Sequence, residues 1–213
     1  MVIFVLSAQP VWARAGGGGG GKGGGIINLI LLPIVLIYSA ILTHKVRKKN
    51  RECLALLEKL ERSDPAWDIA RLKHRVALVY FKVQEAWQAR DQNIAKSYMS
   101  PALFDQHKVQ TDQMIARHEK NLLEKINLIE TDLVDVEDFT DNERDQFWVY
   151  LKGSMIDYTV NDLTNERISG KQEVEEFTEL WKFIRSGNNW VLDEIDQKVS
   201  FSHLRRFRAA TDG

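Results

Sequence analysis

The sequence contains one cysteine, four prolines and no acidic residue before Glu52. A single cysteine, Cys53, excludes an intramolecular disulfide and a metal site built from several thiolates. Without acidic residues, the first 51 residues carry only positive charge, and three more arginines follow Val199. Between these ends, residues 52–199 carry 19 basic and 29 acidic side chains, a net charge of −10. The middle of the chain would therefore repel a nucleic-acid backbone, whereas its ends would attract anionic lipid or RNA.

The first 25 residues have the composition of a targeting segment and a linker rather than of a folded domain. The apolar run "VIFVLSA" is followed by "VWARA", in which the spacing of Ala13 and Ala15 fits signal peptidase and predicts a signal peptide over residues 1–15. No basic residue precedes the run, which is atypical of such a peptide. Residues 16–25, "GGGGGGKGGG", lack the preceding strand that a phosphate-binding loop needs, so we interpret them as a flexible spacer.

An uncharged segment, "IINLILLPIVLIYSAIL", follows the spacer. As a helix it would span roughly 25 Å, close to the thickness of a bilayer core. A buried core helix is the alternative, but the basic cluster after it is typical of a membrane flank. We therefore expect a transmembrane helix over 26–43, and a basic juxtamembrane segment over 44–63 whose membrane-surface residues are Lys45, Arg47, Lys48, Lys49 and Arg51. Lipidation of the nearby Cys53 is conceivable, but a lone thiol on a helix is more often inert.

The remaining chain changes its hydrophobic period once. Asp64-Pro65 and Ser100-Pro101 each combine an N-cap residue with a proline at the first helical position. They predict one helix over about 65–90 and a second, less regular helix that extends to Leu122 and Leu123. From Lys125 onward the pattern alternates as in strands, and Gly153 in the second strand indicates a bulge, a bend or a close approach. The order predicts an α+β fold, with N-terminal helices followed by a curved antiparallel sheet of about four strands.

The last two strands form a hairpin in "FTELWKFIRSGNNWVLDEI", with its turn at Gly187-Asn188. The predicted pairs are Arg185–Trp190, Ile184–Val191, Phe183–Leu192, Lys182–Asp193 and Leu180–Ile195. This register puts one apolar set on each face: Phe177, Trp181, Phe183, Trp190 and Leu192 on the first, and Leu180, Ile184, Val191 and Ile195 on the second. Helices of the domain would cover one face. The other needs a partner surface, an oligomer mate or a second layer.

Four stretches resemble the Tim44-like domain family: "ALVYFKVQEAWQARD", "NLLEKINLIETDLVDVEDF", "MIDYTVND" and "EEFTELWKFIRSGNNWVLDEI". The resemblance covers about 70–197, and we place the domain at 64–199 with a basic tail at 200–213. It implies a cone-shaped fold, like that of the nuclear transport factor two superfamily, with a hydrophobic pocket. The long N-terminal region of the mitochondrial family member is missing, so a role in the import motor is not carried over.

The resemblance also implies a non-enzymatic binding or scaffold protein at a bacterial inner membrane, with a single span and the C-terminal domain in the cytoplasm. The implied partners are membrane lipid, such as cardiolipin or another anionic lipid, and proteins of a translocase or another membrane complex. A homo-oligomer and a ribosome contact through the basic ends are further options. No cofactor, metal or catalytic residue is expected.

We expect seven aromatic residues to line the pocket, although large aromatic side chains at these positions are equally typical of a core. They are Tyr80, Trp87, Phe104, Trp148, Tyr150, Trp181 and Trp190. One alternative is an isomerase or hydrolase of the same fold that uses Asp157, beside Tyr158, with a histidine from His74, His107 or His118. For His107 and His118 a surface or capping role is favoured. Another alternative is a purely structural subunit of a larger membrane complex.

Overall fold

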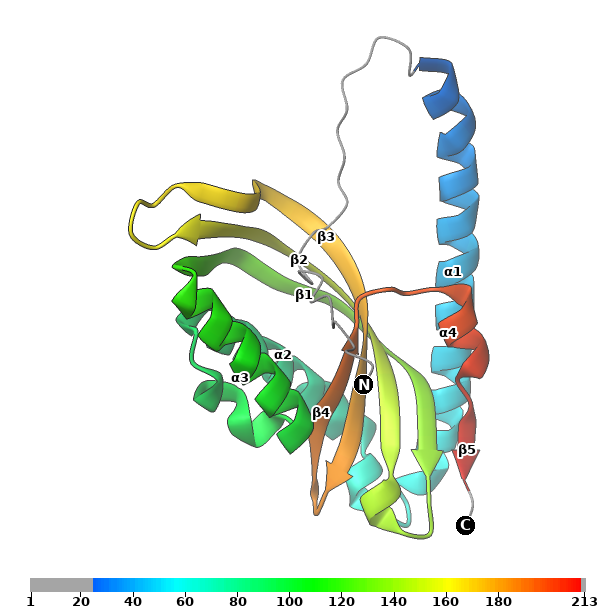
Figure 1. Ribbon diagram of the computed structural model, residues 1–213. Helices are drawn as coiled ribbons and strands as arrows, with labels where there is room; N and C mark the ends of the chain where they lie inside the picture. The colour runs from blue at the N-terminus through cyan, green and yellow to red at the C-terminus, as the bar shows by residue number, and fades with distance from the viewer. Residues whose placement is uncertain (1–24, 212–213) are drawn as a thin grey trace, which may run out of the picture.

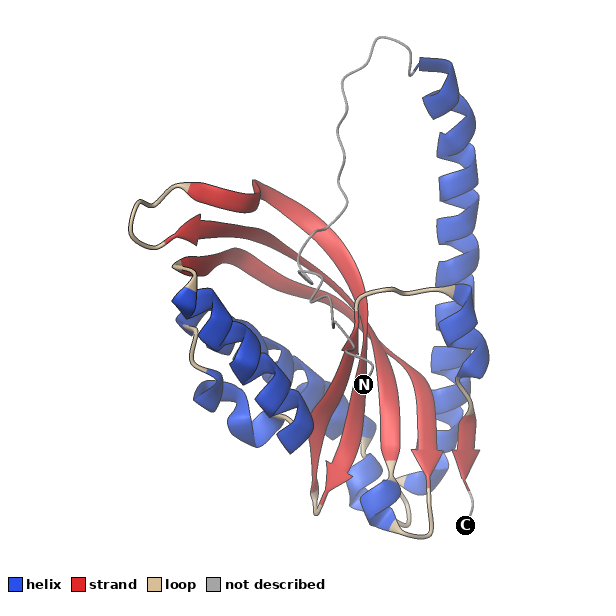
Figure 2. Ribbon diagram, viewed as in Figure 1, coloured by secondary structure: helices blue, strands red, loops and turns tan. Residues whose placement is uncertain are grey.

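The computed structural model describes residues 25–211. Three helices precede a curved sheet: α1 (Gly25–Leu60), α2 (Ile69–Ala89) and α3 (Pro101–Ala116). Helices α2 and α3 lie against the concave side of the sheet, and α1 stands on the opposite side and projects beyond it (Figure 1). The predicted α+β class, with helices first and a curved sheet after them, is confirmed (Figure 2).

Capping residues set where the helices begin. Asp64 caps a single 3₁₀ turn, η1 (Pro65–Trp67), by accepting a hydrogen bond from the backbone N–H of Ala66. Asp68 then caps α2 by accepting from the N–H of Arg71 at 2.7 Å. The predicted helix over 65–90 is therefore a short turn followed by α2, because a second acidic cap restarts the helix four residues later. Ser100 caps α3 as predicted.

After α2, a 3₁₀ segment η2 (Gln92–Tyr98) leads to α3, which ends at Ala116. The expectation that this helix reaches Leu122 and Leu123 is wrong. Both leucines lie in β1 (Glu119–Asp138), where Leu123 packs into the core. The reversal occurs at His118, a non-glycine residue with a φ of 57°, so the helix cannot continue through it.

The sheet is an antiparallel meander with one added strand. Strands β1, β2 (Gln146–Asn161), β3 (Arg167–Ser186) and β4 (Asn189–Asp196) pair in sequence, as the alternating pattern predicts. A 3₁₀ turn, η3 (Asn142–Arg144), joins the first two. The short β5 (Ala209–Thr211), which the pattern does not predict, pairs in parallel with β1, so the order across the sheet is β4-β3-β2-β1-β5.

The β3–β4 hairpin has the predicted register next to its turn and a different one beyond it. Phe183 pairs with Leu192 as expected, but a bulge follows and Lys182 pairs with Glu194. Asp193 is the extra residue, and its carboxylate still meets the Lys182 ammonium at 3.4 Å. The bulge places Ile195 opposite Trp181 instead of Leu180. Ile195 consequently packs with the first apolar set rather than the second.

Each face of the sheet has its own apolar core. The larger core lies between α2 and the concave face and holds Trp67, Tyr80, Phe147, Trp181 and Phe183 among its most buried side chains. The smaller core lies on the other face and consists of Val46, Val134, Tyr150, Leu180, Leu204 and Phe207. Its cover comes from α1 and from α4 (Phe201–Arg206). Part of the second face, around Tyr150 and Leu180, is thus covered by α1 and by the C-terminal tail, whereas Ile184 and Val191 of the same face are half-buried outside this core.

The N-terminal predictions fall largely outside the described residues. The signal peptide over 1–15 lies outside them, as does the glycine-rich spacer except for Gly25. Residues 26–43 and 44–60 form one continuous helix, α1, and several of its apolar side chains are exposed, Leu36 by 59% and Ile37 by 60%. Among residues 36–211, whose side chains the structure describes, no helix has the length and hydropathy that a membrane span requires.

Candidate functional site

The aromatic residues expected to line one pocket are divided between the two faces of the sheet. Tyr80, Trp87, Trp181 and Trp190 are buried in the larger core, where the rings of Tyr80 and Trp181 lie 5.7 Å apart. Phe104 packs at the margin of this core, with the Lys96 ammonium 5.2 Å from its ring centroid.

Trp148 and Tyr150 lie on the opposite face and pack with the smaller core. The ring of Trp148 is 5.3 Å from Phe207 of the C-terminal tail. These two side chains therefore do not share a pocket with the other five. Their alternation along β2 is regular, but the alternation alone does not reveal which face is concave.

The space inside the concave face is small. A cavity of about 30 Å³ lies between α2 and the sheet, and Trp87, Asp157, Glu179 and Trp181 are among its lining residues. The Trp181 indole N–H donates to the Glu179 carboxylate at 2.8 Å, so this wall is already hydrogen-bonded. A cavity of this size holds about one or two water molecules. This volume is too small for a lipid chain.

The three histidines considered for chemistry lie in separate places. His107, expected at the surface or at a cap, is instead buried beside Trp87, and burial lowers its pKa to about 4. His118 follows α3 and its Nδ1 lies 3.3 Å from the Asp162 carboxylate. His74 is exposed on α2. Within residues 25–211, no three His, Cys, Asp or Glu side chains converge as ligands for a metal ion.

Cys53 is fully buried where α1 meets the sheet, and burial raises the pKa of its thiol to about 12. Close to it, the buried carboxyl of Asp135 accepts a hydrogen bond from the backbone N–H of Arg208 in the tail. Burial raises the pKa of Asp135 to about 7. The thiol is thus a packing group, in agreement with the inert role favoured for it.

The structure joins the two basic ends of the chain in one groove. This basic groove lies between α1 and α4, has a volume of about 240 Å³ and is lined by Lys45, Lys48, Lys49, Glu52, Phe201, Leu204 and Arg205. Four of the seven side chains are cationic and one is anionic. Of the five expected membrane-surface residues, Lys45, Lys48 and Lys49 thus line the groove, whereas Arg47 and Arg51 are exposed on α1 outside it.

Local contacts hold this groove in shape. The Lys49 ammonium donates to the backbone carbonyl of Phe207 at 2.8 Å, which ties α1 to the tail. The Lys45 ammonium lies 5.9 Å from the ring centroid of Phe201, and Tyr38 makes an edge contact with the same ring at 4.6 Å. Glu52 is shared by Lys48 and Lys49, at 3.9 and 3.2 Å. Lys45 and Arg205 form no ion pair with a carboxylate in the described part of the chain.

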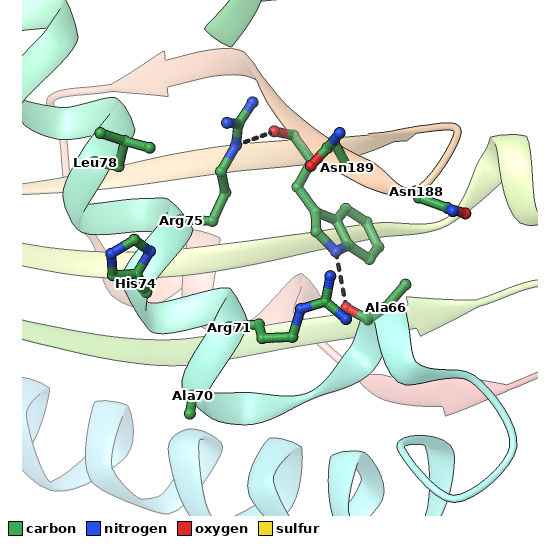
Figure 3. Close-up of a pocket in the computed structure, with 9 residues that line it drawn as sticks. Ala66, Ala70, Arg71, His74, Arg75, Leu78, Asn188 and Asn189 are labelled. Carbon is green, nitrogen blue, oxygen red and sulfur yellow. Dashed lines mark hydrogen bonds between the residues drawn. The ribbon is translucent and has the colours of Figure 1, made fainter.

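A second groove, the distal groove, lies between the start of α2 and the β3–β4 turn (Figure 3). It is open, has a volume of about 470 Å³ and is lined by Ala66, Ala70, Arg71, His74, Arg75, Leu78, Asn188, Asn189 and Trp190. No carboxylate is among these residues. No sequence motif indicates this groove, although the spacing of Arg71, His74 and Arg75 predicts that the three share one helix face.

Helices on the concave side of a curved sheet, with an apolar core on each face, define an α+β domain. The family model of the Tim44-like domain matches residues 55–197, more than half of the chain, and the protein belongs to this family. The resemblance stated from the sequence is therefore confirmed.

Among solved structures, the chain is similar to the intermembrane space region of the chloroplast protein ARC6, known from a crystal structure. The identity is 12% and the TM-score 0.43, over 59% of this chain and 95% of that chain. No curated protein sequence matches the chain.

Proposed function

We propose that this protein is a membrane-associated, non-enzymatic scaffold whose basic groove binds the phosphate groups of anionic lipids. The Tim44-like domain would be held at the surface by α1 and would present its other surfaces to proteins of a membrane complex. The proposed location is the bacterial inner membrane, with the domain on its cytoplasmic side.

The observation that carries the proposal is the position of the basic groove along α1. Exposed apolar side chains, among them Leu36, Ile37 and Ile41, precede Lys45 on the same helix. If this apolar half enters the lipid, the groove lies where the hydrocarbon ends and the headgroups begin. The rings of Tyr38 and Phe201 contact each other next to this boundary. Aromatic rings are enriched at this depth of a membrane.

The chemistry of the groove fits a lipid headgroup. Ammonium and guanidinium groups surround it, and its apolar floor of Phe201 and Leu204 suits the start of an acyl chain. The central part of the chain carries a net charge of −10, so an anionic surface would repel most of the domain and attract the region of this groove. The filled interior also favours binding on the outside over binding inside the cone.

Native mass spectrometry of the full chain in mild detergent tests the lipid site. The variant combines Lys45→Gln, Lys48→Gln and Arg205→Gln, and the probe is cardiolipin or phosphatidylglycerol added to the detergent. Because each basic side chain near an anionic surface contributes about 1 kcal/mol, we expect the affinity to fall by about 100-fold.

A matched control replaces three exposed basic residues outside the groove, Lys59, Arg62 and Lys73, with glutamine. This control should bind both lipids as the parent chain does. Equal losses in the two triple variants would mean that only the total charge matters, and no loss in either would remove the groove from the lipid site. Binding of inorganic phosphate without lipid would identify a free anion as the ligand.

Membrane attachment and orientation need their own measurements. We expect the full chain to stay with membranes during carbonate extraction, and a reporter fused at the C-terminus to be active in the cytoplasm. Release by carbonate would identify a peripheral protein, and a reporter active only in the periplasm would contradict the proposed side.

A further inference from the structure

The distal groove combines cationic, amide and apolar groups at the end of the domain farthest from the apolar half of α1. In Figure 1 the N-terminal half of α1 projects at one end of the molecule, and the β3–β4 turn lies at the other. The start of α2 supplies Arg71, His74 and Arg75, and the turn supplies Asn188 and Asn189 (Figure 3). A binding surface here would face away from the membrane in the proposed orientation.

Arg75 is fixed in the groove by groups that carry no negative charge. Its Nε–H donates to the backbone carbonyl of Trp190 at 2.7 Å, and its guanidinium lies 4.8 Å from the ring centroid of Tyr98. The side chain is half-buried, and this desolvation lowers its pKa. Within residues 25–211 neither Arg71 nor Arg75 forms an ion pair with a carboxylate, although the domain is rich in acidic residues.

A guanidinium that is partly withdrawn from water and has no counterion is costly, and a carboxylate ligand would relieve that cost. The planar fork of arginine suits two-point binding of a carboxylate, and the amides of Asn188 and Asn189 add neutral donors. The remaining walls are apolar and come from Ala66, Ala70, Leu78 and the indole of Trp190. The groove thus fits a ligand that alternates carboxylates with apolar side chains.

We propose that the distal groove binds an acidic, partly apolar segment of a partner protein. A volume of about 470 Å³ is in the usual range of ligand sites. The first 24 residues of this chain contain no Asp or Glu and cannot supply the carboxylates. The choice of a protein segment over a lipid rests on the proposed function, because it depends on the orientation of α1 toward the membrane. The charge complementarity does not depend on it.

The test measures binding of a fluorescent (Glu-Leu)3 peptide to the full chain in mild detergent, by fluorescence anisotropy without added lipid. The isosteric (Gln-Leu)3 peptide controls for apolar binding. We expect the acidic peptide to bind and Arg71→Gln to weaken it roughly tenfold or more, as the loss of a charge-assisted hydrogen bond does. Arg62→Gln, at an exposed position outside the groove, should leave the affinity unchanged.

Arg71→Lys adds a test of geometry, because it keeps the charge and removes the fork; it should bind more weakly than the parent. Equal binding of the two peptides, no binding at millimolar concentration, or an unchanged affinity in Arg71→Gln would overturn the proposal. The proposal would also be overturned if phosphatidylglycerol vesicles displaced the peptide that is bound to the Lys45, Lys48 and Arg205 triple variant. The distal groove would then be a lipid-binding site. Loss of lipid binding in that variant with intact peptide binding would affect only the proposed function, not this site.

Discussion

The carboxyl of Asp135 accepts a hydrogen bond of 2.6 Å from the backbone N–H of Arg208, so a residue of β1 holds the C-terminal tail in place. Asp135 is 4% exposed, and burial raises its pKa from 3.8 to about 7. The folded protein therefore keeps a proton on Asp135 between these pH values while the unfolded chain releases it. Stability from this group is full below pH 3.8 and is lost as the pH rises toward 7.

The variant Asp135→Asn should remove this pH dependence, because the amide keeps an acceptor oxygen for Arg208 and carries no charge. At pH 8 we expect the variant to be more stable by about 2 to 4 kcal/mol, and at pH 4 the difference should be small. Urea unfolding at a series of pH values measures this. Asp105→Asn, at an exposed site, is the control, and an equal change in both variants would contradict the assignment.

Gly153 lies directly under the ring of Phe177. A Cβ added at Gly153 would come within 2.5 Å of the Phe177 Cζ and 3.0 Å of the Tyr80 hydroxyl. The close approach indicated by the sequence is therefore real, and Gly153→Ala should cost about 1 to 3 kcal/mol of unfolding free energy. Because the shortest contact is with the Phe177 ring, adding Phe177→Leu should cost less in the Gly153→Ala background than in the parent. Additive losses in denaturant unfolding would locate the strain elsewhere.

The sequence was informative where the determining interactions are local. Ser100 caps α3 by accepting from the N–H of Leu103, three residues along the chain, and the pairs nearest the β3–β4 turn are set by the turn itself. The bulge at Asp193 could not be predicted, because the shifted and unshifted registers both give Lys182 a carboxylate partner. The shift is favoured by the fold, which buries Ile195 with the larger core.

The candidate sites depend on contacts between distant parts of the chain. Lys49 and Phe207 are 158 positions apart, and no local pattern indicates that the two basic ends meet. For the same reason the sequence leaves open whether a partner, an oligomer mate or a second layer covers the second sheet face, and the structure places α1 and α4 over part of it. A two-residue period separates the faces of a strand without showing what lies over each, so the pattern of β2 does not indicate that Trp148 and Tyr150 lie on the face opposite the other five aromatics.

The buried His107 should give the folding stability a pH dependence opposite to that given by Asp135, with the loss occurring at acidic pH. Burial lowers its pKa from 6.5 to about 4, so the neutral ring is the folded form. The stability it contributes is present above pH 6.5 and is lost as the pH falls toward 4. Its buried Nδ1 has no hydrogen-bond partner among the described residues, so an apolar replacement costs little.

We expect His107→Leu to match the parent chain near pH 7 and to be more stable by about 2 to 3 kcal/mol at pH 4. Thermal or urea unfolding at both pH values provides the measurement. His74→Gln changes an exposed histidine and should follow the parent at both. A variant that loses stability at pH 7 and gains none at pH 4 would show that the ring is needed for packing against Trp87.

Arg185 links three connections of the fold. It should be the polar side chain whose replacement costs the most stability. Its guanidinium pairs with Asp64, between α1 and α2, and with Asp145, between β1 and β2, at 2.9 Å for the latter. Its Nε–H donates to the Gly187 carbonyl in the β3–β4 turn at 3.0 Å. Asp145 is fully buried, so removal of Arg185 would leave a buried carboxylate without its counterion.

For Arg185→Met we expect a loss of about 3 to 5 kcal/mol in unfolding free energy, the usual cost of breaking one side of a buried pair. Adding Asp145→Asn should recover part of this loss, because the stranded charge disappears. Arg167→Met, at an exposed position of β3, controls for the loss of an arginine. If the loss in the double variant equalled the sum of the two single losses, Asp145 would be stabilised by groups other than Arg185, such as the backbone N–H of Phe139, which donates to it at 2.8 Å.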